Sequence, residues 1–307
     1  MQISRIKGWF LVSAGMLMLL AGCGEDTKTE YVEVSAPAST YLVEYVPGTM
    51  PNGMMMNATM GKSTFQIRVR KRSDGSAAMG LASSMTVYPL MHMNDGRNHA
   101  SPADPVTESG TPGTYDCTVY YLMPDIMGST VTGFWDLTVT IGTESAIFNP
   151  SVGMSMGDTS LFKLYGNQDL IKSTTTSTLP EKRVYLLFHD GLVSGSTFST
   201  LNLFIATKET MLNFPAVSIG TVLSNTTGTW AVDGPTTSLY ASLDSTFSAG
   251  TVTGVDNGGG HWSLPEITGL SSGATTTVYV QFTVNSELKT AGTTTTAAGY
   301  ASFSVTP

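Results

Sequence analysis

Methionine is distributed unevenly along this sequence, and its thioether is one of the side-chain groups that can bind metal. Of the 17 Met, three lie within the first 22 residues, thirteen lie between Met50 and Met156, and only Met211 follows. Protein cores use Met as an adaptable filler, but a filler would be shared between both halves of the chain. The concentration therefore indicates that something local to the first half favours soft sulfur.

Two Met-x-Met motifs could supply a metal site. Met91-His92-Met93 is followed by a turn sequence and His99, and Met154-Ser155-Met156 lies between glycines. On an extended strand both sulfurs of such a motif point the same way. With an imidazole they form a soft donor set that suits Cu(I) and does not suit Mg²⁺ or Ca²⁺. The sequence therefore predicts a copper site, with Cu(I) favoured, from Met91, His92, Met93, His99, Met154 and Met156.

The same motifs allow a structural interpretation, which the sequence leaves open. In it, two residues of Met91-His92-Met93 pack inward and the third is exposed. Met123 and Met127 could close a site or cap a hairpin, and we favour packing. Met54-Met55-Met56 and Met60 lie among Gly, Asn and Pro residues that are typical of a surface loop. The protein would then be a structural or adhesive module that binds a protein partner without metal, with Met as adaptable packing.

The region around Met91 also resembles the YtkA-like family of extracytoplasmic β-sandwich domains, which is related in outline to the FixH accessory proteins. The resemblance covers about residues 60 to 145 and rests on Met85-Thr86-Val87-Tyr88-Pro89-Leu90-Met91-His92-Met93, His99, Pro102, Gly113-Thr114-Tyr115, Leu122-Met123-Pro124 and Gly133-Phe134-Trp135-Asp136-Leu137. It implies a sandwich fold and copper handling by the Met/His loop.

One motif formally fits a hydrolase. Gly153-Met154-Ser155-Met156-Gly157 has the G-x-S-x-G spacing, and His189 or His261 could serve Ser155 as a base. That motif needs a strand that feeds a helix, whereas strand-like sequence lies on both sides of Ser155. CxxC and HExxH motifs do not occur in the sequence. We therefore predict no enzyme and no catalytic residues.

The elements that must position these residues are β-strands. Period-2 alternation of apolar and polar residues recurs at 65–70, 115–121, 135–141 and 278–284, which predicts one buried and one wet face for each strand. It also buries Cys117, which has no intramolecular disulfide partner if Cys23 is lipidated. Short strands between Gly, Pro, Asn and Asp clusters predict an all-β fold with two immunoglobulin-like β-sandwich domains.

The first residues resemble a bacterial lipoprotein signal peptide. Arg5 and Lys7 precede an uncharged run that is too short to span a bilayer, and Leu20-Ala21-Gly22-Cys23 resembles a lipobox. The resemblance implies lipidation at Cys23, and Gly24 favours the outer membrane. We divide the chain into a signal peptide (1–22), lipidated Cys and tether (23–38), a Met-rich sandwich (39–172), a Ser/Thr-rich linker (173–180) and a second sandwich (181–307).

Charge limits the partners. Without residues 1–22 the chain has 13 Lys and Arg against 23 Asp and Glu, a formal charge of −10. Nucleic acid is therefore not an expected partner. We expect a lipid-anchored extracytoplasmic protein, on the periplasmic or surface face of a bacterial membrane, that binds copper for sequestration or delivery.

Overall fold

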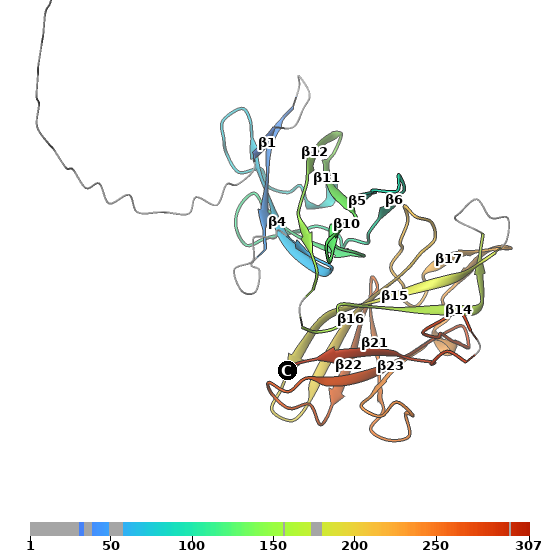
Figure 1. Cartoon of the computed structure of the whole chain (residues 1–307). Coiled ribbons are helices and arrows are strands. Elements are labelled where there is room, and N and C mark those ends of the chain that lie inside the picture. The colour runs from blue at the N-terminus through green and yellow to red at the C-terminus, as the bar shows by residue number, and fades with distance from the viewer. Residues whose placement is uncertain (1–30, 34–38, 49–57, 156, 173–179, 295) are drawn as a thin grey trace, which may run out of the picture.

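The computed structural model describes residues 31–33, 39–48, 58–155, 157–172, 180–294 and 296–307. The predicted signal peptide and Cys23 lie outside these residues. The described chain forms strands and two 3-10 helices, Ala82–Ser84 and Gly234–Thr236, with no α-helix. Figure 1 shows two β-sandwiches, the first in blue and green and the second in yellow to red. The predicted all-β, immunoglobulin-like fold is confirmed.

The first sandwich contains two antiparallel sheets. One has the order β1-β2-β4-β8-β7, with bounds Tyr31–Glu33, Tyr41–Pro47, Gly61–Lys71, Thr114–Tyr121 and Thr107–Glu108. The other has the order β12-β11-β5-β6, with bounds Glu144–Phe148, Gly133–Ile141, Met85–Met93 and Asn98–Ala100. Two small pairs join β9 (Ile126–Met127) to β10 (Thr130–Val131) and, in parallel, β13 (Val152–Gly153) to β3 (Ala58–Thr59). Strand β1 lies within the stretch that we expected to be only a tether.

The second sandwich is built in the same way. One sheet has the order β14-β15-β16-β22-β21, with bounds Leu161–Ile171, Glu181–Ser194, Ser199–Thr207, His261–Ile267 and Val255–Gly258. Facing it, β20-β19-β23-β24 have bounds Val252–Thr253, Ser238–Ser242, Thr276–Val284 and Glu287–Leu288, and β25 (Ala301–Val305) also pairs with β23. A hairpin of β17 (Val222–Asn225) and β18 (Gly228–Ala231) completes the domain.

The predicted domain boundary was wrong. Strand β14, which we assigned to the first domain, pairs with β15 along its length, and its Leu164 lies in the second hydrophobic core. The division between the sheets therefore falls between β13, which ends at Gly153, and β14, which begins at Leu161. The Ser/Thr-rich stretch connects two strands of one sheet, and its composition is as typical of such a loop as of a linker.

Alternation along the strands builds both cores. In β8 the buried residues Tyr115, Cys117, Val119 and Tyr121 all belong to the first core, as predicted, and Cys117 is a free, buried cysteine. Burial raises the pKa of the Cys117 thiol to about 12, so the group stays a neutral, unreactive thiol. In β23 the four alternating apolar residues, Val278 to Val284, lie in the second core.

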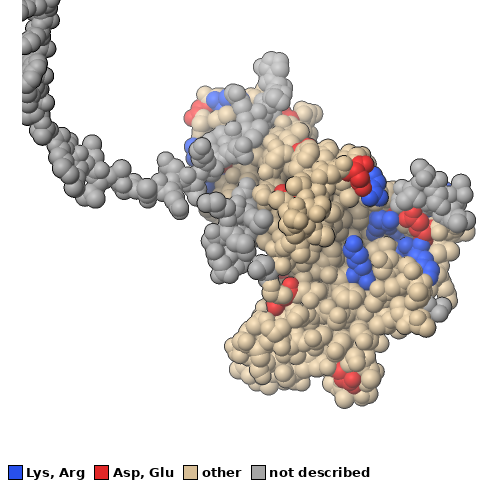
Figure 2. Space-filling view, in the orientation of Figure 1, with Lys and Arg blue, Asp and Glu red and all other residues tan. Residues whose placement is uncertain are grey.

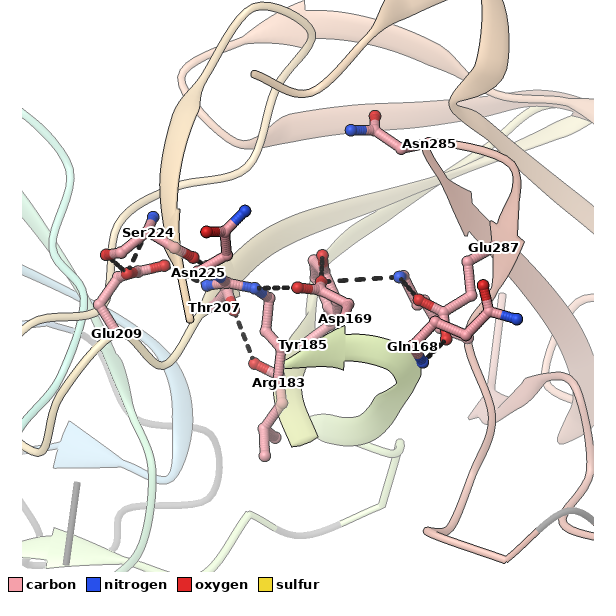
Figure 3. A network of polar contacts seen from close by, with 12 residues as sticks. Gln168, Asp169, Arg183, Tyr185, Thr207, Glu209, Ser224, Asn225, Asn285 and Glu287 are labelled. Atoms are coloured by element: carbon pink, nitrogen blue, oxygen red, sulfur yellow. Dashed lines mark hydrogen bonds and ion pairs between the residues drawn. The ribbon is translucent and has the colours of Figure 1, made fainter. Parts of the chain in front are cut away.

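One end of the second sandwich holds a buried polar network (Figure 3). Arg183 has a fully buried side chain that pairs with Asp169, Nε to Oδ1 at 3.0 Å, and with Glu209. The ammonium of Lys289 reaches Asp169 at 3.6 Å and Glu287 at 2.6 Å. Each of these buried carboxylates has a cationic partner, which repays part of its desolvation cost. We therefore interpret the network as structural: it joins β14, β15, β17 and β24.

Candidate functional site

The structure does not bring Met91, His92 and Met93 together. They are consecutive on β5, so alternation directs Met91 and Met93 to one face and His92 to the other. Met91 is fully buried in the first core, in one row with Trp135 of β11 and His99 of β6. Its sulfur is sealed in apolar packing.

His92 has other partners on the outer face. Its Nε2 lies 2.8 Å from Oδ2 of Asp136, and its ring stacks on Phe134 with centroids 4.8 Å apart. Met154 is exposed beyond the end of β13, and Met156 lies outside the described residues. Of the six predicted ligands, the structure therefore brings only Met93 and His99 to one place, which is a pocket.

This interdomain pocket has a volume of about 740 Å³ and lies between the two sandwiches. Five of the nine Met that the structure describes line this pocket: Met60, Met93, Met123, Met127 and Met211. The first four belong to the first sandwich. We call the four Met of the first sandwich, together with His99, the Met wall. Met211 approaches from the second sandwich, where its carbonyl accepts a hydrogen bond of 2.8 Å from the Ala100 amide.

Local geometry explains why Met93 reaches the pocket and Met91 does not. Met93 is the last residue of β5, and its partner on β11 is Gly133, which has no side chain. An added Cβ at Gly133 would meet the His92 carbonyl oxygen at 2.2 Å, so this position has room only for glycine. Gly133 therefore places no side chain beside Met93 at the end of the sheet, and the Met93 side chain reaches the pocket.

His99 is the imidazole of the Met wall. Its Nδ1 lies 3.0 Å from the Ala100 carbonyl oxygen, and because a carbonyl only accepts, this nitrogen carries the hydrogen. The lone pair then lies on Nε2, which no residue in the described part of the chain hydrogen-bonds. Burial lowers the pKa of His99, and nearby Lys163 lowers it further, so the ring is neutral at physiological pH. The Trp135 ring meets it edge to face and fixes its plane.

Basic side chains from both sandwiches also border the pocket. Lys163 and Lys208 come from the second sandwich and Arg97 from the first, and the lining includes no Asp or Glu among the described residues. Figure 2 shows Lys and Arg side chains gathered on one flank of the visible face, with some Asp and Glu side chains beside them. The pocket therefore joins soft, neutral donors to a basic rim.

The other end of the domain interface, which we call the closed end, consists of Lys62, Asp104, Tyr120, Asp190 and His261. Tyr120 points out of β8, yet it is fully buried because its ring stacks on Phe204 of the second sandwich at 3.9 Å and 5°. Its hydroxyl oxygen lies 2.9 Å from Oδ1 of Asp190 and 3.2 Å from Oδ2 of Asp104, and the two carboxylates share its single hydrogen.

His261 bridges the same two carboxylates at 3.1 Å each, and they raise its pKa to about 9. Lys62 pairs with Asp190 at 2.8 Å. At neutral pH the cations Lys62 and His261 therefore face the anions Asp104 and Asp190 at this end of the interface. These contacts hold the two sandwiches together beside the pocket.

The hydrolase-like motif has no elbow in this fold. Ser155 lies between β13 and β14, in a stretch where the described residues form no helix. Ser155 and His189 do line one pocket of about 250 Å³. The Nε2 of His189 is buried without a hydrogen-bond partner among the described residues, so the Ser155 hydroxyl does not contact it.

The sequence did not lead us to assign Met60, Met123 or Met127 as ligands, and it gave no indication of the basic rim. One available signal was the apolar run Val184-Tyr185-Leu186-Leu187-Phe188. Such a run predicts a strand that is buried on both faces, and therefore a second layer over the sheet. Within the described residues no three His, Cys, Asp or Glu side chains group as a metal site, and none of the described helices is long and apolar enough to cross a membrane.

Comparisons with known proteins give distant matches only. No protein family matches the chain, and no curated protein does. Among solved structures, domains 5-6 of the S-layer protein SbsC are 13% identical, with 81% of this chain and 91% of that chain covered and a TM-score of 0.21. A mutated three-immunoglobulin-domain segment of titin is 11% identical, with 74% and 89% covered and a TM-score of 0.16. Neither similarity is close enough to bear on activity or partners.

Proposed function

We propose that this protein is held by lipid at Cys23 outside the cytoplasm and binds Cu(I) in the interdomain pocket, for sequestration or delivery. The observation that carries the proposal is the gathering of five thioethers and a neutral imidazole around one pocket. Met93 and His99 remain from the predicted ligand set, and Met60, Met123, Met127 and Met211 replace the others.

The donor set fits a soft, monovalent ion. Thioether and neutral imidazole need no deprotonation, and softness favours Cu(I) over Mg²⁺, Ca²⁺ or Mn²⁺. His99 is already in the required tautomer, because the Ala100 carbonyl fixes the hydrogen on Nδ1. In this proposal His99, the neutral imidazole of the pocket, is a ligand to the ion and is not free to act as a general base, which supports storage or transfer rather than catalysis.

A Cu(I) titration under reducing conditions, with a competing chelator, tests this site. We expect Met93→Leu/Met123→Leu/Met211→Leu to weaken binding by at least about tenfold, because Leu keeps the volume and removes the sulfur. The matched control is Met79→Leu/Met154→Leu, since both residues are exposed and outside the pocket lining. Equal affinity in the pocket variant and the wild type would exclude the site.

The lipid anchor has a separate test. The lipobox resemblance at Leu20-Ala21-Gly22-Cys23 supports it. We expect Cys23→Ser to abolish labelling by a radioactive fatty acid in a bacterial host and to release the protein from the membrane fraction. Continued labelling of the Cys23→Ser protein would place the lipid elsewhere.

A second candidate, a structural or adhesive surface module, is supported by the closed end. A buried stacked aromatic pair and matched charges make the two sandwiches a stiff unit, as a spacer requires. This function needs no metal. Wild-type protein that fails to bind Cu(I) would favour it.

A further inference from the structure

The outer face of the second sandwich is apolar where a wet face is expected. Along β15, Tyr185 and Leu187 point into the core, while Leu186 and Phe188 belong to a separate apolar cluster on the other face, with Val184 packed against it. Tyr120 of the first sandwich covers the Phe188 end of this row. Val184 and Leu186 continue it into the interdomain pocket. The pocket therefore lies over an apolar strip that the first domain covers only in part.

The basic rim stands out against the charge of the whole chain. The protein has a formal charge of −8, yet the pocket lining includes three basic side chains and no carboxylate among the described residues. Lys208 pairs with Glu181 at 3.1 Å, and Arg97 pairs with Asp95. Lys163 is exposed and has no ion pair within the described part of the chain. A cation held free beside an apolar wall favours a ligand that is anionic at one end and apolar along the rest.

We propose that the interdomain pocket binds a free long-chain carboxylate. The carboxylate would lie at Lys163 and Lys208, and the chain would run along Val184, Leu186 and Phe214 toward the Met wall. The volume is in the range of pockets for small organic ligands, and thioethers adapt to a flexible chain. This inference rests on the apolar strip and the rim, and it does not depend on copper.

Equilibrium dialysis of radioactive palmitate tests the proposal on the chain from Gly24 onward, which keeps every described residue and needs no detergent. We expect Lys163→Gln/Lys208→Gln to weaken palmitate binding by at least about tenfold, through loss of hydrogen bonds to the charged carboxylate. The control Lys71→Gln/Lys172→Gln removes the same charge at exposed positions outside the pocket and should bind palmitate as the wild type does. Hexadecanol, which has the chain without the charge, should bind more weakly to the wild type and equally to all variants.

Two results would overturn the proposal: equal palmitate affinity in the Lys163/Lys208 variant and the wild type, or hexadecanol affinity that equals that of palmitate. The Met93/Met123/Met211 variant separates this proposal from the copper proposal. Because Leu preserves the apolar volume, that variant should bind palmitate within about threefold of the wild type while it loses Cu(I). Wild-type Cu(I) affinity in the Met93/Met123/Met211 variant would therefore contradict the copper proposal alone, and wild-type palmitate affinity in the Lys163/Lys208 variant would contradict the carboxylate proposal alone.

Discussion

At the closed end of the domain interface, Tyr120 fills the space between the sandwiches and every charge faces an opposite one, whereas at the pocket the facing side chains leave room. The closed end stacks rigid rings, Tyr120 on Phe204, at contact distance. At the pocket Met93 has only Gly133 beside it on β11, and Lys163 has no counter-charge among the described residues. One interface therefore holds the two domains in place at one end and stays accessible at the other. Four substitutions test this difference between the two ends.

The largest effect is expected from Tyr120→Ala. Removing a fully buried aromatic ring leaves a cavity, and such changes cost about 3–5 kcal/mol of unfolding free energy. The control Tyr120→Phe keeps the ring and loses only the hydrogen bonding of the hydroxyl to charged carboxylates, about 1.5–3 kcal/mol. Urea denaturation measures both. An Ala variant as stable as the Phe variant would show that the stacked ring does not hold the domains together.

Asp190→Asn should have the next largest effect. This carboxylate accepts hydrogen bonds from Tyr120 and His261 and pairs with Lys62, and hydrogen bonds to a charged group contribute about 1.5–3 kcal/mol. Asp95→Asn is the matched control, because its pair with Arg97 is exposed and screened by solvent, so its loss should change the stability little. Similar unfolding midpoints for both variants in urea would mean that the closed end is no stronger than a surface ion pair.

The protonation of His261 gives a pH dependence. Its folded-state pKa, about 9, lies above the ordinary 6.5, so its stabilisation is complete below about pH 6.5 and is lost as the pH rises through 9. We expect the thermal midpoint of the wild type to fall more steeply from pH 6.5 to 9.5 than that of His261→Gln. Parallel curves for the two proteins would show that the imidazolium does not stabilise the interface.

The smallest effect is expected from Met93→Leu. A volume-conserving exchange costs less than about 1.5 kcal/mol, and Met93 borders open space. Met91→Ala, in the sealed core, should instead cost about 2–5 kcal/mol. Thermal denaturation of Met93→Ala beside Met91→Ala sharpens the contrast, because equal losses would make Met93 a core residue rather than part of a wall.

Most of the correct predictions came from the alternation of apolar and polar residues along single strands. It put Tyr115, Cys117 and Tyr121 in the core because period-2 burial is a local property of a strand. The same pattern places Tyr120 on the wet face, and only the second sandwich buries it. The assignment of β14 failed for a related reason, since pairing partners far along the chain decide which sheet a strand joins.

The pocket could not be predicted from patterns within single segments of the sequence. The sequence singled out Met-x-Met spacing, but the residues that line one pocket come from separate strands and loops, including Met60, Met123 and Met211. The concentration of Met was a valid signal, whereas the grouping of Met91 with His92 was not, because neighbours on a strand point apart.

Strand β6 gives the loop that carries Met211 one further role. β6 is the last strand of its sheet, and such a border exposes unpaired amide and carbonyl groups that can recruit another chain. The carbonyl of Met211 occupies the Ala100 amide, and the Leu212 carbonyl accepts the Tyr88 hydroxyl at 3.3 Å. Separation of the domains would therefore expose the Ala100 amide, so the same loop that borders the pocket also covers part of the open border of the first sandwich.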